Sequence, residues 1–444
     1  MNKCIPLLTL ALALAACEEK PYGALPTPQQ IAWQDMELTM FCHFGPNTFT
    51  GLEWGEGTEA EDIFNPTDLD CRQWVRTAKA AGFKGIIITG KHHDGFCLWP
   101  NPASTHTVRE SSWRGGQGDV LKELSEACAQ EGIRFGIYIS PWDRNAPEYG
   151  TDAYNEVFRR TLESALSGYG PVFEQWFDGA CGEGPNGKRQ VYDWDLFHQE
   201  VFKWQPQAIV FSNIGPGCRW VGNEEGRAGR TSWAPFHPER HGATHENLEG
   251  DYGTYLPEGD PDGPFWIPSE TDVSIRPGWF WRESENDKVK SVNELLKIYY
   301  ESVGRNSQLL LNVPPDSRGH LHEVDSTRLM EFRAALDQIF ARDLSLGQKR
   351  KGQVWTVKVN PEKPFNRIVL CEDIAKGQRV ASFMVEARTA DGWKPLAEES
   401  TIGHKRILLV PETCTSELRV TVTDALAKPL LGKIGLYYDT IYTE

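Results

Sequence analysis

The stretch GIIITGKHHDGFCLWPNPAST, residues 85–105, places a short run of apolar β-forming residues directly before two adjacent histidines, an aspartate and two large aromatic residues. An apolar run of this kind, without polar alternation, predicts a strand that is buried on both faces. The polar and aromatic residues that follow predict that this strand ends at a functional site.

The same arrangement recurs along the chain from residue 33 to about residue 340. Apolar runs alternate with stretches in which apolar residues return every three to four positions, as in DCRQWVRTAKAAG at 70–82 and DVLKELSEACAQEG at 119–132. Such stretches are typical of helices with one buried face. The alternation therefore predicts repeated β-α units around a parallel sheet.

Polar clusters follow nearly every predicted strand, and they decide between two α/β architectures. They read HFG at 43–45, GKHHDGF at 90–96, SPWDRN at 140–145, WFDGACG at 176–182 and SNIGPG at 212–217. In a (β/α)8 barrel all carboxyl ends of the strands converge on one face, where the active site is built. An open sheet would leave them along an edge, and the sequence has no GxGxxG loop to bind a nucleotide there. We expect a (β/α)8-like TIM barrel with irregularities, because eight clean strands cannot be counted.

The chain divides into four expected segments. Residues 1–17, MNKCIPLLTLALALAAC, have a basic start, a short apolar run and small residues before a cysteine, which predicts a lipoprotein signal peptide. Residues 18–32 would form a tether, 33–345 the catalytic barrel, and 346–444, with short alternating strands, a C-terminal β-sandwich. The alternative at the N-terminus is a plain secretory signal cut near Ala16. Either signal predicts export, and lipid on Cys17 would hold the chain at the outer membrane, facing the periplasm or the cell surface.

The composition narrows the range of partners. A net charge of −16 argues against nucleic acid, which needs clustered lysine and arginine. Eight cysteines between Cys42 and Cys414 form no CxxC pair, so they predict buried thiols, with room for one or two disulfides, and no zinc site. Sixteen tryptophans exceed the needs of a core and favour stacking on sugar rings.

His92 and His93 stand where the second strand leaves the barrel, so both can reach its mouth. A metal site is the rival interpretation, but adjacent histidines without HExxH or a carboxylate triad fit a metal-dependent barrel hydrolase poorly. A polyhydroxy ligand, with Trp54 and Trp99 as apolar walls, explains the pattern better. A further alternative is that His93 belongs to the core and only His92 reaches the ligand.

Asp178 follows an apolar strand and precedes Gly179, a suitable place for a carboxylate nucleophile. The alternative is an aspartate that caps the following segment. A retaining glycosidase needs a second carboxyl about 5 to 5.5 Å away. Glu224, Glu225 and Glu270 are candidates, and spacing does not choose among them.

Several motifs together resemble the α-L-fucosidases of glycoside hydrolase family 29. They are, in chain order, HFGPNTF, EWGEG, GKHHDGFCLWP, YISPWDRN, FEQWFDGA, RWVGNEEG, SIRPGWFW and GRNSQLLLNVPPD. The resemblance implies a retaining double displacement through a fucosyl-enzyme intermediate, no metal or other cofactor, and a fucosylated glycan as substrate. It also implies the barrel and the β-sandwich.

The resemblance assigns residue roles by motif. Asp178 would be the nucleophile, with Trp176 beside it, and Glu224 the acid/base, as in the branch that acts on α-1,3 and α-1,4 linkages. Other branches place the acid/base elsewhere, so Glu270 and the linkage stay open. The residues expected to hold or flank fucose are His43, Glu53, Trp54, His92, His93, Tyr138 and Trp279. The rival functions are a metal-dependent barrel hydrolase, a non-catalytic fucose-binding lectin, and a glycosidase for a related sugar such as α-L-galactose.

Overall fold

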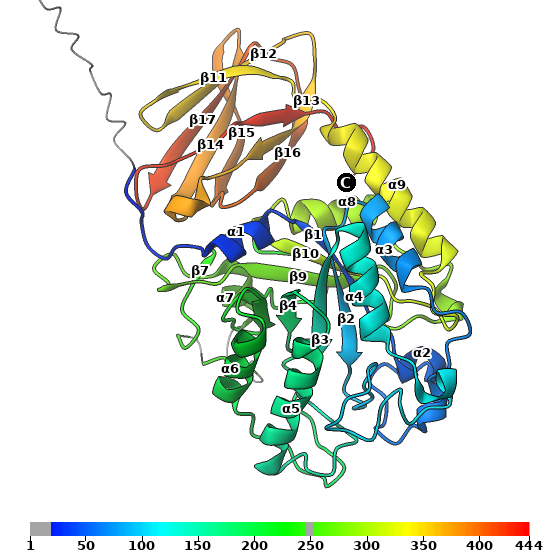
Figure 1. The fold of residues 1–444 in the computed structure, drawn as a ribbon. Coiled ribbons are helices and arrows are strands. Elements are labelled where there is room, and N and C mark those ends of the chain that lie inside the picture. The colour runs from blue at the N-terminus through cyan, green and yellow to red at the C-terminus, as the bar shows by residue number, and fades with distance from the viewer. Residues whose placement is uncertain (1–18, 241, 246–251, 444) are drawn as a thin grey trace, which may run out of the picture.

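The computed structural model describes residues 19–240, 242–245 and 252–443, and it forms a barrel followed by two antiparallel sheets (Figure 1). The predicted signal peptide at 1–17 lies outside the described residues. Within the described part of the chain, no helix combines the length and the apolarity needed to cross a membrane. The eight cysteines from Cys42 to Cys414 all carry free thiols.

Parallel strands close the barrel in the order β1-β10-β9-β6-β5-β4-β3-β2, which confirms the predicted TIM-like fold. Nearly all of their residues are buried, as expected for strands covered on both faces. Their bounds are β1 Leu38–Cys42, β2 Gly85–Lys91, β3 Arg134–Ile139, β4 Val172–Trp176, β5 Ile209–Ser212, β6 Cys218–Trp220, β9 Ser269–Ser274 and β10 Gln308–Asn312.

Strand β6 is the irregular member of the barrel. It pairs in parallel with β5 on one side and β9 on the other, although only residues 213–217 connect it to β5 and no helix intervenes. Parallel neighbours usually need a crossover of a dozen or more residues. Three residues, one of them Arg219, show neither an apolar run nor a period, so the sequence did not reveal this strand.

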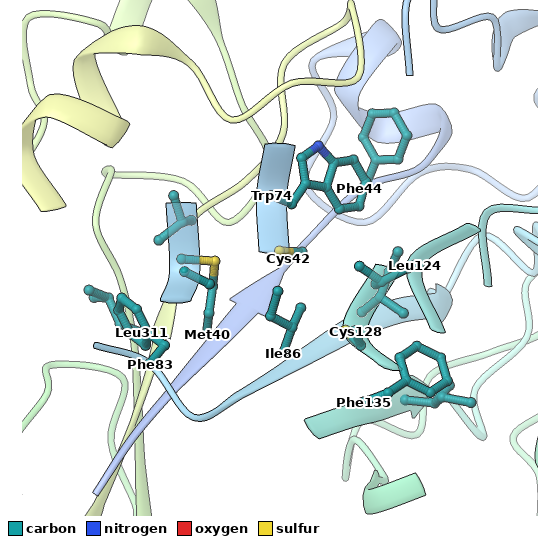
Figure 2. Packing of buried hydrophobic residues seen from close by; sticks show 14 of the residues in the cluster. Met40, Cys42, Phe44, Trp74, Phe83, Ile86, Leu124, Cys128, Phe135 and Leu311 are labelled. Atoms are coloured by element: carbon teal, nitrogen blue, oxygen red, sulfur yellow. The ribbon is translucent and has the colours of Figure 1, made fainter. Parts of the chain in front are cut away.

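Helices surround the barrel, and successive strand residues alternate between two cores. Met40, Cys42 and Ile86 face outward against the helices, whereas Phe41 and Ile87 belong to the cluster inside the barrel. Figure 2 shows the outer layer, in which Met40, Cys42 and Ile86 pack near side chains of the helices α3 and α4, namely Trp74, Leu124 and Cys128. The helices are α1 Pro28–Gln34, α2 Pro46–Thr50, α3 Cys71–Ala80, α4 Val120–Glu131, α5 Ala153–Ser167, α6 Trp194–Trp204, α7 Tyr252–Glu258, α8 Val292–Glu301 and α9 Glu323–Phe340.

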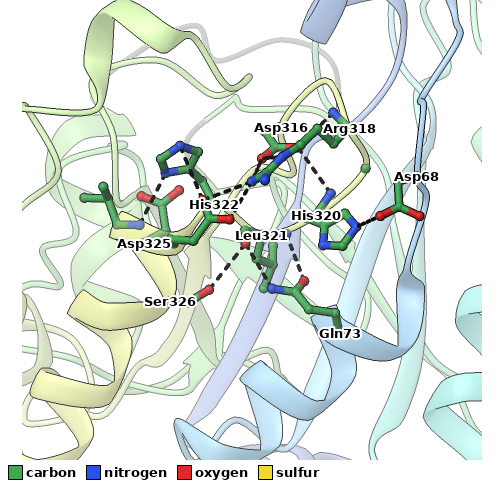
Figure 3. A network of polar contacts seen from close by, with 12 residues as sticks. Asp68, Gln73, Asp316, Arg318, His320, Leu321, His322, Asp325 and Ser326 are labelled. Atoms are coloured by element: carbon green, nitrogen blue, oxygen red, sulfur yellow. Dashed lines mark hydrogen bonds and ion pairs between the residues drawn. The ribbon is translucent and has the colours of Figure 1, made fainter.

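A polar network fixes the connection between β10 and α9 (Figure 3). The Gln73 side chain of α3 exchanges two hydrogen bonds with the backbone of Leu321, at 3.0 and 2.9 Å. His320 Nε2 lies 3.0 Å from Asp68 Oδ2, and Arg318 donates to Asp316 Oδ2 at 2.6 Å. The network therefore joins the last connection of the barrel to its first large helix.

The C-terminal part confirms the predicted β-sandwich. One sheet has the order β11-β12-β17-β14-β15 and the other β16-β13-β18, with antiparallel pairs and one shared apolar core. Sequence patterns missed β11 and β15, whose residues are mostly exposed or half-buried and do not alternate. The bounds are β11 Ser345–Lys351, β12 Val354–Val359, β13 Phe365–Leu370, β14 Val380–Thr389, β15 Gly392–Ser400, β16 Arg406–Thr413, β17 Glu417–Ala425 and β18 Gly435–Tyr437.

Backbone hydrogen bonds tie the sandwich to the barrel. Ile407 N donates to Gly304 O, and Asn306 N donates to Lys405 O, both at 2.9 Å. The two parts therefore share a hydrogen-bonded seam next to the start of β10.

Candidate active site

The carboxyl ends of the barrel strands enclose a small cavity, as the fold predicts. Ten of the side chains expected at the site line this cavity, together with two residues that the sequence did not single out, Phe41 and Asp272. The expected residues are His43, Glu53, Trp54, His92, His93, Tyr138, Trp176, Asp178, Glu224 and Trp279.

Asp178 lies just beyond β4 and is held by hydrogen bonds to both carboxylate oxygens. Oδ1 accepts from the backbone N–H of Ala180 at 2.8 Å, and Oδ2 accepts from the Tyr138 hydroxyl at 3.0 Å. The turn packs closely against the segment after β5, because a Cβ on Gly179 would lie 2.2 Å from Asn213 Nδ2. Asp178 thus caps its own turn, as the alternative interpretation held, and also presents a fixed carboxylate to the cavity.

Three histidines form one wall of the cavity, and burial keeps each of them neutral. Burial lowers the pKa of His43 to about 3 and that of His93 to about 4, and holds the pKa of His92 well below its usual value. His43 Nδ1 lies 2.9 Å from Asn312 Oδ1, and His93 Nδ1 lies 2.8 Å from Ser140 Oγ. Each of these contacts leaves the Nε2 atom for the cavity, and that of His93 is 3.7 Å from Asp178 Oδ2.

Neutral imidazoles can donate or accept hydrogen bonds, which suits a ligand rich in hydroxyl groups. Both adjacent histidines line the cavity, so His93 is not confined to the core. Among the described residues, the two groups of side chains close enough to share a metal ion include neither His92 nor His93.

Glu224 follows β6 and brings a second carboxyl into the cavity. Its Oε2 accepts a hydrogen bond from Trp279 Nε1 at 3.3 Å. The residue as a whole is exposed, but partial burial of its carboxyl in the cavity, and then the nearby charges of Asp178 and Glu53, raise the pKa of Glu224 above its usual value. The environment therefore favours a protonated carboxyl, as a general acid requires.

The other two candidates for the acid/base lie elsewhere. Glu225 is exposed and pairs with Arg227 at 2.7 Å. Glu270 is fully buried in the barrel, deeper than the cavity, where its Oε1 accepts from Trp176 Nε1 at 2.8 Å. Burial and the neighbouring Glu174 carboxyl hold the pKa of Glu270 well above its usual value, so this residue anchors Trp176 from below.

Glu53 and Trp54 lie at the rim of the cavity. Glu53 Oε1 accepts from the backbone N–H of Trp279 at 2.6 Å, and its other oxygen pairs with Arg282. Trp54 is 58% exposed at the rim, and its ring lies 6.3 Å from the ring of His93.

The expectation that Trp99 forms a wall is wrong. Its indole is 1% exposed and donates to Ser164 Oγ of α5 at 3.0 Å, so it packs between the barrel and a helix. The chain turns back after residue 93, and this turn carries the side chain away from the mouth.

Asp272 is the functional candidate that sequence analysis missed. It lies on β9, two residues after Glu270, so both side chains point into the barrel. Two acidic residues at this spacing in a strand that must be buried were the available signal. The barrel interior therefore contains a column of carboxyl groups below and beside Asp178.

Comparisons with known proteins show the family to which the chain belongs. The family model described as Alpha-L-fucosidase matches residues 56–338. The chain is 40% identical to Alpha-L-fucosidase 1 of Arabidopsis thaliana, over 94% of this chain and 88% of the relative.

Solved structures show the same similarity. A glycoside hydrolase 29 family member from an unknown rumen bacterium superposes with a TM-score of 0.89 at 39% identity, covering 96% of this chain and 79% of the other. A Ruminococcus gnavus GH29 fucosidase in complex with fucose superposes with a TM-score of 0.85 at 31% identity, covering 95% and 97%. The chain therefore belongs to the alpha-L-fucosidase family, glycoside hydrolase family 29.

Proposed function

We propose that the protein is a retaining exo-α-L-fucosidase that releases terminal α-1,3- or α-1,4-linked L-fucose from glycans. One observation carries the proposal: a single cavity holds an anchored carboxylate, Asp178, and a carboxyl whose environment favours the proton, Glu224. Two carboxyls in unlike environments can supply the nucleophile and the acid/base of glycoside hydrolysis by double displacement.

In the first step Asp178 attacks the anomeric carbon while Glu224 gives its proton to the departing glycosidic oxygen. The hydrogen bonds from Tyr138 and Ala180 keep the attacking carboxylate in place. In the second step Glu224, now ionised, takes a proton from water, and this water releases fucose from Asp178.

The walls of the cavity fit the sugar that the family name implies. Fucose lacks the 6-hydroxyl group, so its site needs hydrogen-bonding groups for the ring hydroxyls and an apolar surface for the methyl group. The histidine wall supplies the first, and the rings of Phe41, Trp176 and Trp279 supply the second. The fucose complex of the Ruminococcus gnavus relative supports this choice of sugar.

The linkage preference rests on the motif WVGNEEG, in which Glu224 is the first glutamate after the asparagine, and on the resemblance of this motif to the branch that acts on α-1,3 and α-1,4 linkages. Release of fucose from Lewis-type trisaccharides, compared with 2'-fucosyllactose, tests this preference. Equal or faster hydrolysis of the α-1,2-linked substrate would contradict it.

The role of Asp178 is tested by substitution. We expect Asp178→Asn to lower turnover of an aryl fucoside by several orders of magnitude with the fold intact, because no other group in the cavity replaces the nucleophile. For Asp178→Gly, added azide should restore turnover and give the inverted fucosyl azide. An Asp178→Asn variant that keeps more than about a tenth of wild-type turnover would contradict the assignment.

We further propose that the chain is exported and anchored through lipid on Cys17, at the outer membrane and facing the periplasm or the cell surface. The signal-like pattern of residues 1–17 supports this proposal.

A further inference from the structure

We propose that Asp272 is a fourth acidic residue of the active site, beside Glu53, Asp178 and Glu224, and that it is a neutral carboxylic acid that donates a hydrogen bond to the bound sugar. This inference rests on the proposed function, because it assigns a sugar contact within the same cavity. It goes beyond the two carboxyls that the double displacement uses.

The position of Asp272 is the first support. Its side chain lines the cavity together with Asp178 and Glu224, although the residue as a whole is only 3% exposed. The strand fixes this position, because β9 pairs with β10 on one side, where Asp272 lies opposite Leu310, and with β6 on the other. A side chain placed by a paired barrel strand is held more rigidly than one on a loop.

The hydrogen bonding of Asp272 is the second support. Trp220 Nε1 donates to Asp272 Oδ1 at 2.8 Å. An indole N–H can only donate, so Oδ1 is the accepting oxygen and the proton of a neutral carboxyl is left to Oδ2. Trp220 therefore orients the carboxyl, and the hydroxyl is the group that we assign to the ligand.

The charges around Asp272 are the third support. Asp178 faces it from the end of β4, Glu224 from the segment after β6, and Glu270 from one layer deeper on its own strand. Among the described residues that line the cavity there is no lysine or arginine, and the three histidines are neutral. Arg282 stands at the rim, but it pairs with Glu53 and Glu285.

A carboxyl in this setting keeps its proton. Burial, and then the charges of Glu224 and Asp178, hold the pKa of Asp272 well above its usual value. An ionised Asp272 would add a second negative charge beside the nucleophile without any cation to balance it, which is costly in a buried site. As a neutral acid it instead adds a donor to a cavity whose other acidic residues act as acceptor and proton source.

Infrared difference spectroscopy at pH 6 tests the proton directly. Subtracting the spectrum of Asp272→Asn from that of the wild type should reveal the carbonyl stretch of one protonated carboxyl, and this band should shift when fucose is added. Glu372→Gln is the matched control, because Glu372 is a buried acid of the sandwich whose pKa burial raises to about 7. Its band should not respond to fucose. Carboxylate bands in place of the protonated band, or a protonated band that ignores fucose, would overturn the proposal.

Kinetics supply the second readout. Asparagine preserves both the acceptor for Trp220 and a donor for the sugar, so Asp272→Asn should bind fucose more tightly than Asp272→Ala, which has neither group. Asp272→Ala should weaken fucose binding by about 3- to 10-fold, the loss of one neutral hydrogen bond. Turnover of Asp272→Asn as low as that of Asp178→Asn would mean an ionised catalytic carboxylate and would refute the assignment.

These outcomes remain separable from the proposed function. A wild-type protein that releases no fucose from an aryl fucoside fails the proposed function, whereas the infrared band still reports the charge state of Asp272. If the alanine variant does not fold, the asparagine variant and the band decide the question.

Discussion

Replacing Glu224 by alanine tests whether Glu224 is the acid/base and Asp178 the nucleophile. The side chain is the proposed proton donor to the departing sugar oxygen, and its proton is favoured by burial and by the charges of Asp178 and Glu53. A poor leaving group, such as the N-acetylglucosamine of Fuc-α-1,3/4-GlcNAc, needs that proton, whereas a nitrophenolate does not. The variant should therefore lose activity in proportion to the basicity of the leaving group.

The size of the effect follows from the role. General acid catalysis contributes about 10²- to 10⁴-fold, so hydrolysis of the disaccharide should fall by about that factor. The first step with 2-chloro-4-nitrophenyl fucoside should be nearly unchanged, and added azide should rescue the second. Trp279 Nε1 loses its acceptor at 3.3 Å, which adds a small cost common to all substrates.

The pH dependence carries a definite sign. Glu224 works in its protonated form in the first step, and its pKa is raised, so kcat/KM of the disaccharide should fall as the pH rises through that pKa. The alanine variant should lack this alkaline decline. A pH series with both substrates measures the difference.

Glu225→Ala is the matched control, because the neighbouring residue is exposed and pairs with Arg227 on the surface. Its kcat/KM should stay within about threefold of wild type for every substrate, since exposed pairs contribute little. Leaving-group dependence in Glu270→Ala, with none in Glu224→Ala, would refute the reasoning and would also remove the basis for the α-1,3/1,4 preference.

Three further outcomes are expected. Tyr138→Phe removes the hydroxyl that donates to Asp178 at 3.0 Å. The kcat/KM for an aryl fucoside should therefore fall about 10- to 100-fold, the usual loss for a hydrogen bond to a charged group. An unchanged kcat/KM would show that the contact is dispensable. Glu270→Gln keeps an acceptor for Trp176 and mimics the neutral acid, so the thermal midpoint and kcat should change little. Glu270→Ala should destabilise the fold by about 1–3 kcal/mol, because it leaves the indole N–H of Trp176 without an acceptor. Equal Tm values for the two variants would contradict this role. Cys17→Ala should abolish incorporation of labelled fatty acid and detergent partitioning, while a wild-type chain found only in the aqueous phase would leave the plain secretory signal.

The sequence predicted the barrel because helical periods and apolar runs alternate over most of its length. Strand β6 was not predicted, because Cys218–Trp220 is too short to show a sequence pattern and pairs with a strand, β9, that is distant in the chain. In the sandwich, β11 and β15 were not predicted, because they are defined by their pairing with β12 and β14 and not by an apolar face.

The candidate site was predictable to the extent that residues at strand ends share a face of the barrel. Asp178 and His92 needed only that rule. The choice of Glu224 over Glu270 depends on how deep each side chain lies along the barrel axis, and the spacing of residues in the sequence does not give that depth. Trp99 was misplaced because the direction of a turn is set by tertiary packing. Asp272 was missed, although Glu270 of the same strand was a candidate, because spacing does not give the depth at which each strand residue lies in the barrel.

The long connection between β6 and β9 allows the substrate range of such an enzyme to change in one direction. The nucleophile Asp178 lies two residues beyond a paired barrel strand, whereas Glu224 lies on this long connection, which follows the shortest strand of the barrel. Loops accept insertions and deletions that strands do not. Mutation can therefore change the part of the pocket that contacts the leaving group while the part that binds fucose stays the same. Specificity for the aglycone and specificity for the sugar are then able to evolve separately.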